Sequence, residues 1–344
     1  MPYVQFLFIC CVWGGSFILM DRALLAFSPI DIALGRLIGG ATVLGLFCLA
    51  TRQWARLGPV DWAHLFLVAF LSNTIPFVIQ PYVMDQAGEH AYFGMMVAFV
   101  PLATILASIP MLRKWPSAKQ LLGVLGGLVC MLFVVQDGSQ RGISLSLLAL
   151  ALTVPLVYAL GNTYIKWKLD HLPAAPLTAI FLGVGGLLLI PMQFAPALVE
   201  QMGLSGPAAP TDWPLAIASL LFLSVVGTGI AVLMFIRLIQ TQGPLFAGMV
   251  TYVVPLLALV WGQYDSELLT STQVLAMIGV LAMVAVVQWG AATPNQTALS
   301  IRPPAGPQRG PRSPDTNLPP TNSELAEPNN VATSSPPQAE PATD

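Results

Sequence analysis

The stretch Tyr92-Phe93-Gly94-Met95, which runs through apolar residues to Pro101, returns later as Phe246-Ala247-Gly248-Met249 running to Pro255. In both copies a Gly-Met pair precedes the proline by the same distance. With a shift of one residue, residues 122–134 also align with residues 275–287, which places Gly126 opposite Gly279. The repeat period is about 150 residues, so the sequence predicts two related halves.

The composition indicates the class of protein. Of the 344 residues, 56% are hydrophobic and only 9% are charged, whereas about a quarter are charged in an ordinary soluble domain. A polytopic membrane protein embedded in a lipid bilayer is therefore predicted. The charges, which sum to −2, are too few to make a field that would attract nucleic acid, so no nucleic-acid partner is expected. The four cysteines lie in apolar runs without metal-binding spacing, so no metal and no cofactor are expected.

Ten runs are long and apolar enough to cross a bilayer, which takes about 20 residues. Residues beyond 290 are rich in Pro, Ser, Thr, Asn and Gln, a composition that favours disorder. The predicted fold is an all-α membrane protein with two five-helix repeats, residues 3–136 and 143–290, and a disordered cytoplasmic tail, residues 291–344. The predicted spans are 3–21, 29–50, 62–84, 90–112, 118–136, 143–165, 174–195, 213–236, 243–263 and 270–290.

The distribution of Lys and Arg predicts the orientation, because basic residues are retained on the cytoplasmic side of short loops. With a cytoplasmic N-terminus, eleven of the 14 basic residues fall on the inside and only Arg22 and Arg141 on the outside. The remaining one, Arg36, lies within a span. Both termini are therefore predicted to be cytoplasmic.

Five spans in each repeat is an odd number, so the second repeat enters the membrane upside down relative to the first. Inverted repeats are typical of secondary transporters, in which two similar halves expose a shared site to either side in turn. The topology thus predicts a transport cycle with a small-molecule substrate. It does not indicate an oligomeric state.

The first predicted span carries Trp13-Gly14-Gly15-Ser16-Phe17, and in the second Pro29 precedes Arg36. These motifs resemble those of the EamA-type family of the drug/metabolite transporter superfamily, whose first helix opens with Trp-Gly-x-x-Phe. The resemblance covers residues 3–290 and implies two fused five-helix domains in a bacterial inner membrane. It also implies export of amino acids or related compounds. The chain departs from the pattern at Asp21-Arg22, where many relatives have a lysine, and at Tyr158-Ala159, which replaces Trp-Gly.

Arg36 is the most informative charge, because a cation within a span is costly unless something compensates it. Two interpretations stay open. Arg36 faces a central cavity and binds a substrate carboxylate or phosphate, or it is a structural clamp that reaches loop carbonyls and Asp31.

Pro101 and Pro255 each lie in the middle of a span and remove the backbone hydrogen bond to the carbonyl four residues earlier, at Val97 and Thr251. Because both repeats keep the proline, the sequence predicts a hinge at each position. The alternative is that neighbouring helices satisfy the freed backbone and the proline has no moving role.

Polar and aromatic side chains at the middle depth of the spans are candidates for a substrate-binding cavity. Each one has the alternative role of joining neighbouring helices. The candidate substrate-binding residues are Trp13, Ser16, Arg36, Asn73, Gln80, Tyr158, Asn162, Thr228 and Tyr252.

The leading hypothesis is a secondary transporter that works by alternating access. A rival within transporters is a carrier for nucleotide-sugar-like or phosphorylated anions, which calls for more than one cation in the cavity. A membrane-embedded enzyme or sensor is a further rival, but the sequence contains no catalytic constellation and no folded output domain.

Overall fold

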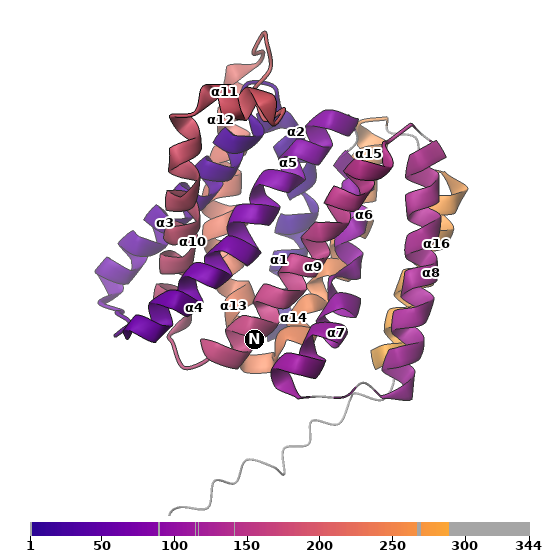
Figure 1. Ribbon diagram of the computed structural model, residues 1–344, viewed down its shortest axis with the longest axis horizontal. Helices are drawn as coiled ribbons and strands as arrows, with labels where there is room; N and C mark the ends of the chain where they lie inside the picture. The colour runs from indigo at the N-terminus through magenta and orange to yellow at the C-terminus, as the bar shows by residue number, and fades with distance from the viewer. Residues whose placement is uncertain are drawn as a thin grey trace, which may run out of the picture. The chain divides into compact units, whose positions relative to one another are not determined.

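A computed structural model describes residues 2–88, 90–113, 115, 117–140, 142–266 and 270–288. All regular structure within these residues is helical (Figure 1). The predicted tail, residues 291–344, lies outside the described residues, as do the last two residues of the final predicted span.

The first repeat contains α-helices interrupted by one π-helical segment, η1, and one 3-10 turn, η2. They are α1 (Pro2–Gly14), α2 (Ser16–Leu24), α3 (Pro29–Thr51), α4 (Pro59–Ala69), η1 (Phe70–Thr74), α5 (Ile75–Ala87), α6 (His90–Met96), η2 (Val97–Phe99), α7 (Val100–Leu112) and α8 (Ala118–Gln140).

The second repeat follows a similar order, with a π-helical segment, η3, after its third long helix. Its elements are α9 (Leu145–Lys168), α10 (Ala174–Gln193), α11 (Pro196–Gln201), α12 (Trp213–Phe222), η3 (Leu223–Ile230), α13 (Ala231–Gln242), α14 (Pro244–Gly248), α15 (Val250–Tyr264) and α16 (Ser271–Gln288).

Within the described residues, eight helices are long and apolar enough to span a membrane. They match eight of the ten predicted spans. The other two predicted spans, 118–136 and 270–290, correspond to α8 and α16, whose apolar parts are shorter, Leu121–Val134 and Ser271–Met283. A multi-pass membrane protein is thus confirmed, and the count of ten spans stays a prediction.

Helix α3 begins at a capping box that fixes where Arg36 lies. The Ser28 hydroxyl accepts the backbone N–H of Asp31, and the Asp31 carboxylate accepts the backbone N–H of Ser28. Pro29 at the first turn suits this start, because its missing N–H has no helical partner there. Arg36 follows two turns later and is buried.

The π-helical segments occupy corresponding places in the two repeats. η1 contains Ser72 and Asn73, and η3 contains Ser224 and Thr228. A π-helical segment inserts an extra residue into a helix and is frequent at functional sites. The similar stretches Phe70-Leu71-Ser72 and Phe222-Leu223-Ser224 lie at these two places, but their residues give no signal for the π-helical geometry.

The two copies of the repeated stretch contain helix breaks before their prolines. The first is the 3-10 turn η2, which ends just before Pro101, and the second lies at Met249, between α14 and α15. The carbonyl of Val97 accepts the backbone N–H of Val100, so this carbonyl is satisfied in place of the bond that Pro101 removes. The first irregularity thus lies next to Pro101, whereas Pro255 lies inside the continuous helix α15, six residues after the break at Met249.

Glycines let the helices of the two repeats approach one another closely. A Cβ on Gly94 would lie 2.7 Å from the Cβ of Ala258, and a Cβ on Gly126 would lie 2.2 Å from the Sδ of Met283. A Cβ on Gly279 would lie 2.6 Å from the Sγ of Cys130. The aligned glycines Gly126 and Gly279 thus lie at one interface, between α8 and α16, which run side by side in Figure 1.

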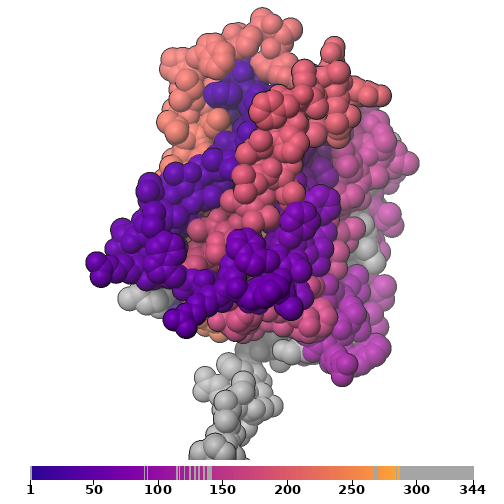
Figure 2. Space-filling view, turned by 60° about the vertical axis from the view of Figure 1, so that its left-hand side comes forward, coloured from indigo at the N-terminus to yellow at the C-terminus, as the bar shows by residue number. Residues whose placement is uncertain are grey.

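Helix α10 packs against α3 and α4, and Figure 2 shows these three helices next to one another on one face. Glycines again permit the contact, because a Cβ on Gly186 would lie 2.5 Å from the Cδ1 of Ile38. This packing encloses η1 and the side of α3 that carries Arg36.

Candidate functional site

A pocket lies between helices of both repeats, at the depth of the π-helical segments. It encloses about 90 Å³, less than the roughly 300–1,000 Å³ of typical ligand pockets, so it suits a compact molecule. Its described lining residues are Trp13, Ser16, Phe17, Met20, Arg36, Ser72, Asn73, Phe77, Gln80, Val97, Val100, Tyr158, Asn162, Ile165, Phe181, Val232, Phe235, Ile236, Thr251 and Val254.

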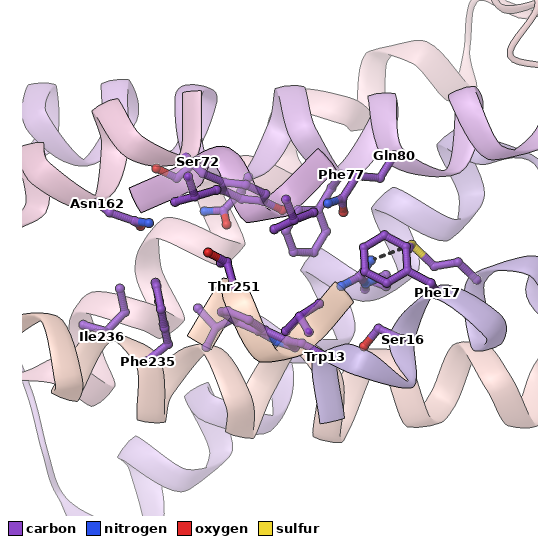
Figure 3. A pocket seen from close by; sticks show the side chains of 18 of the residues that line it. Trp13, Ser16, Phe17, Ser72, Phe77, Gln80, Asn162, Phe235, Ile236 and Thr251 are labelled. Carbon is purple, nitrogen blue, oxygen red and sulfur yellow. Dashed lines mark hydrogen bonds between the residues drawn. The ribbon is translucent and has the colours of Figure 1, made fainter. Parts of the chain in front are cut away.

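Seven of the nine candidate residues from the sequence line this one pocket. In Figure 3, Ser72, Phe77 and Gln80 approach the shared space from one side, whereas Trp13 and Thr251 approach from the other. The seven are Trp13, Ser16, Arg36, Asn73, Gln80, Tyr158 and Asn162.

The other two candidates do not line the pocket. The hydroxyl of Thr228 accepts a hydrogen bond from Nε of Arg36 at 3.2 Å. Tyr252 is buried in a separate apolar cluster with Phe99, Leu102 and Ile105, so its neighbour Thr251 faces the pocket instead. The structure thus places Tyr252 outside the described pocket lining, and a role for it in substrate binding stays a prediction.

The guanidinium of Arg36 is held by uncharged neighbours. Its side chain is only 5% exposed. Its Nε donates to Thr228, its Nη1 donates to the Sδ of Met20 at 3.1 Å, and its Cζ lies 4.3 Å from the centroid of the Phe77 ring. None of the described residues forms an ion pair with it.

Asp31 does not compensate Arg36, contrary to the clamp interpretation. One carboxylate oxygen of Asp31 accepts hydrogen bonds from the backbone and hydroxyl of Ser28, and the other accepts one from the Gln193 amide at 2.9 Å. The carboxylate is thus used at the helix start, and Arg36 lies in the pocket lining.

Trp13 connects the first repeat to η3. Its indole N–H donates to the carbonyl of Gly227 at 3.0 Å, and its ring lies 4.8 Å from that of Phe235, measured between centroids. The hydrogen bond satisfies a carbonyl inside a π-helical segment, where the regular bonding pattern is altered. Trp13 therefore both lines the pocket and joins two helices.

Two polar groups of η1 have no hydrogen-bond partner within the part of the chain that the structure describes. They are the amide nitrogen of Asn73, whose residue is 2% exposed, and the hydroxyl of Ser72, whose residue is 6% exposed. Leaving a buried donor unpaired costs free energy. Both residues line the pocket, and the two unpaired atoms are themselves buried.

An ionic cluster joins both repeats at the C-terminal end of α15. Asp265 accepts a hydrogen bond from Arg22, and its second oxygen lies 3.0 Å from Nε2 of His90. Arg22 also donates to Asp21 at 2.9 Å. The cluster connects α2, α6 and α15 and lies outside the pocket lining.

The sequence analysis missed Phe77, Ile165 and the apolar lining from α13. A helical spacing argument identifies the first two, because Phe77 lies between Asn73 and Gln80 on one face, and Ile165 follows Asn162 by one turn. The α13 residues Val232, Phe235 and Ile236 lack such a signal, since each is apolar like the rest of the span.

Comparisons with known proteins also divide the chain into two similar segments. The model of the EamA-like transporter family matches residues 1–136 and 145–289. Seventeen chains of solved structures match, including one described only as "Crystal structure of protein", with 15% identity, a TM-score of 0.59, and coverage of 85% of this chain and 98% of that one. No curated protein sequence matches significantly. At this identity the structural likeness supports the fold alone, but the family match covers most of the chain, which therefore belongs to the EamA-like transporter family.

Proposed function

We propose that this membrane transporter moves a small metabolite by alternating access, with the pocket as its substrate site. The observation that carries the proposal is that both family-matched segments contribute side chains to one pocket. Two related halves around a shared site are the architecture that secondary transporters use. We assign substrate contact to Trp13, Ser16, Arg36, Asn73, Gln80, Tyr158 and Asn162, with Thr228 orienting Arg36.

The proposed transport is export of amino acids or related compounds across a bacterial inner membrane. The presence of Arg36 favours a substrate with a carboxylate, because a guanidinium and a carboxylate form strong charge-assisted hydrogen bonds. A cytoplasmic N-terminus agrees with the basic loops, and Figure 1 places the N-terminus at the end of the bundle where α7 connects to α8. The connection includes Arg113, and α8 begins with Lys119 in its first turn.

Pro101 and Pro255 are the proposed hinges. The break before each proline interrupts the regular helical hydrogen bonding, and breaks of this kind absorb changes of backbone angle. A Cβ on Gly248 would lie 3.6 Å from the ring of Pro101, so the two repeated stretches are in contact where the movement is proposed.

A carrier for nucleotide-sugar-like anions is less well supported. Such a substrate carries several negative charges and calls for several cations, whereas Arg36 is the one charged side chain among the described lining residues. The cavity of about 90 Å³ is also small for such a molecule.

A substrate panel in vesicles tests the proposal. The purified chain is reconstituted into proteoliposomes, and accumulation of labelled amino acids and related carboxylic acids is followed with and without a proton gradient. We expect saturable, protein-dependent flux of at least one carboxylate that Arg36→Gln abolishes and the matched control Arg237→Gln, outside the pocket, retains. Chemical conversion of a compound without its redistribution would contradict the proposal.

A further inference from the structure

The pocket contains an unbalanced positive charge. Arg36 is the one charged residue among its described lining residues, and its guanidinium contacts the Thr228 hydroxyl, the Met20 thioether and the Phe77 ring. A buried cation without a counter-ion is unfavourable in a low-dielectric environment. A ligand with a net negative charge removes this imbalance when it enters.

The hydrogen-bonding capacity of Arg36 also suits an anion. A guanidinium carries several N–H donors, and a carboxylate is an acceptor with about four lone-pair sites. Within the described residues the guanidinium donates to Thr228 and Met20, and its other N–H groups can donate to a carboxylate that enters the pocket.

The same lining offers no charged partner to an ammonium group. The described lining includes no Asp or Glu, so the ammonium of a zwitterion has only neutral acceptors and lies in the field of Arg36. Like charges repel strongly where the dielectric constant is low. Many of the other lining residues are apolar or aromatic, with Phe17, Phe181 and Phe235 among them, and they suit an apolar body.

We propose that the pocket selects net-anionic monocarboxylates with an apolar or aromatic body over zwitterions and cations of the same shape. This inference rests on the proposed function and narrows its substrates from amino acids to the related carboxylic acids that lack the ammonium group. Arg36 is the residue that determines charge specificity, and Thr228 is the positioning residue that orients its guanidinium.

A trio of ligands that differ only in charge tests the proposal directly. 3-Phenylpropionate is the anion, phenylalanine adds an ammonium, and 2-phenylethylamine keeps the ammonium without the carboxylate. Binding to the purified full chain is measured by equilibrium dialysis in detergent, with the signal of protein-free micelles subtracted. We expect 3-phenylpropionate to bind about tenfold or more tighter than phenylalanine, and 2-phenylethylamine to show no saturable binding.

Variants identify the group responsible. Arg36→Gln is expected to lose the preference for the anion, Arg36→Lys to keep it with weaker binding because the planar fork is lost, and Arg237→Gln to bind like the unaltered protein. The ligand order in the unaltered protein decides the question even where Arg36→Gln fails to fold.

The proposal is overturned if phenylalanine binds as tightly as 3-phenylpropionate, if no saturable binding of the anion occurs, or if folded Arg36→Gln binds it unchanged. Flux through proteoliposomes separates this inference from the transport function. If phenylalanine accumulates in a protein-dependent way and the anion is not preferred, the transport proposal holds and the proposed charge selection is overturned. If the anion binds in an Arg36-dependent way but no panel compound is transported, the charge selection holds and the transport proposal is overturned.

Discussion

Gly161 allows α9 to approach η1 closely. A Cβ at this position would lie 1.6 Å from the Oγ of Ser72 and 2.9 Å from its Cβ. Rotation of the hydroxyl relieves only the first contact, so the backbones must separate to accommodate any side chain. Glycine thus brings Ser72 and Asn73 next to Asn162 in the pocket.

Replacing Gly161 with alanine is therefore expected to destabilise the protein by about 1–3 kcal/mol, the usual cost of overpacking a tight interior. The loss is measured as a decrease in the apparent melting temperature in detergent. Gly45→Ala is the matched control, because a Cβ there has no neighbour within 4 Å. Equal melting temperatures for the two variants would contradict the packing described at Gly161.

The indole N–H of Trp13 gives a second prediction for a single residue. Trp13→Phe keeps an aromatic ring and removes the hydrogen bond to the Gly227 carbonyl, with an expected cost of about 1 kcal/mol from the bond. Trp62→Phe serves as the control, because Trp62 is 50% exposed and should change stability little. Thermal unfolding of both variants checks this, and an unchanged melting temperature in Trp13→Phe would argue against the contact.

At the scale of helices, the ionic cluster around Asp265 joins α2 and α6 of the first repeat to α15 of the second. The Asp265 side chain is 16% exposed, so solvent screens it only in part. Connections at the ends of helices from different repeats restrict how far these helices can move apart.

Asp265→Asn removes the charge that faces Arg22 and His90, and we expect it to lower stability by about 1–2 kcal/mol. Asp170→Asn provides the comparison, because Asp170 pairs with Lys166 one turn away and is 41% exposed. Exposed pairs of this kind contribute about 0.3–0.5 kcal/mol. Similar melting temperatures for the two variants would show that the cluster does not hold these helices together.

The helical pattern predicted much of the site, and local departures from regular helix account for what it missed. Tyr158 and Asn162 lie one turn apart on a regular stretch of α9, so their common face followed from the sequence. Tyr252 follows the break at Met249, which shifts the phase of the helix and brings Thr251 into the pocket. Thr228 lies in η3, where the extra residue of the π-helical segment likewise shifts the phase of the helix.

At the scale of the whole molecule, residues that the sequence repeat aligns lie in contacts between the two halves. Gly126 and Gly279, aligned by sequence alone, contact opposite helices of one interface. The side on which α13 contributes to the pocket was not predictable, because a uniformly apolar helix gives no signal for one face. Packing against α1, α9 and α10 determines that face.

Alternating access is the central claim, and accessibility of one pocket residue from each side of the membrane tests it most directly. Ser16→Cys, in a chain whose four native cysteines are replaced by alanine, places one thiol in the pocket lining. Ser219→Cys is the control, because Ser219 is 3% exposed and lies outside the lining. The account predicts that a membrane-impermeant thiol reagent modifies Ser16→Cys in both right-side-out and inside-out vesicles and leaves Ser219→Cys unmodified in both. Modification of Ser16→Cys from one side alone would contradict the account.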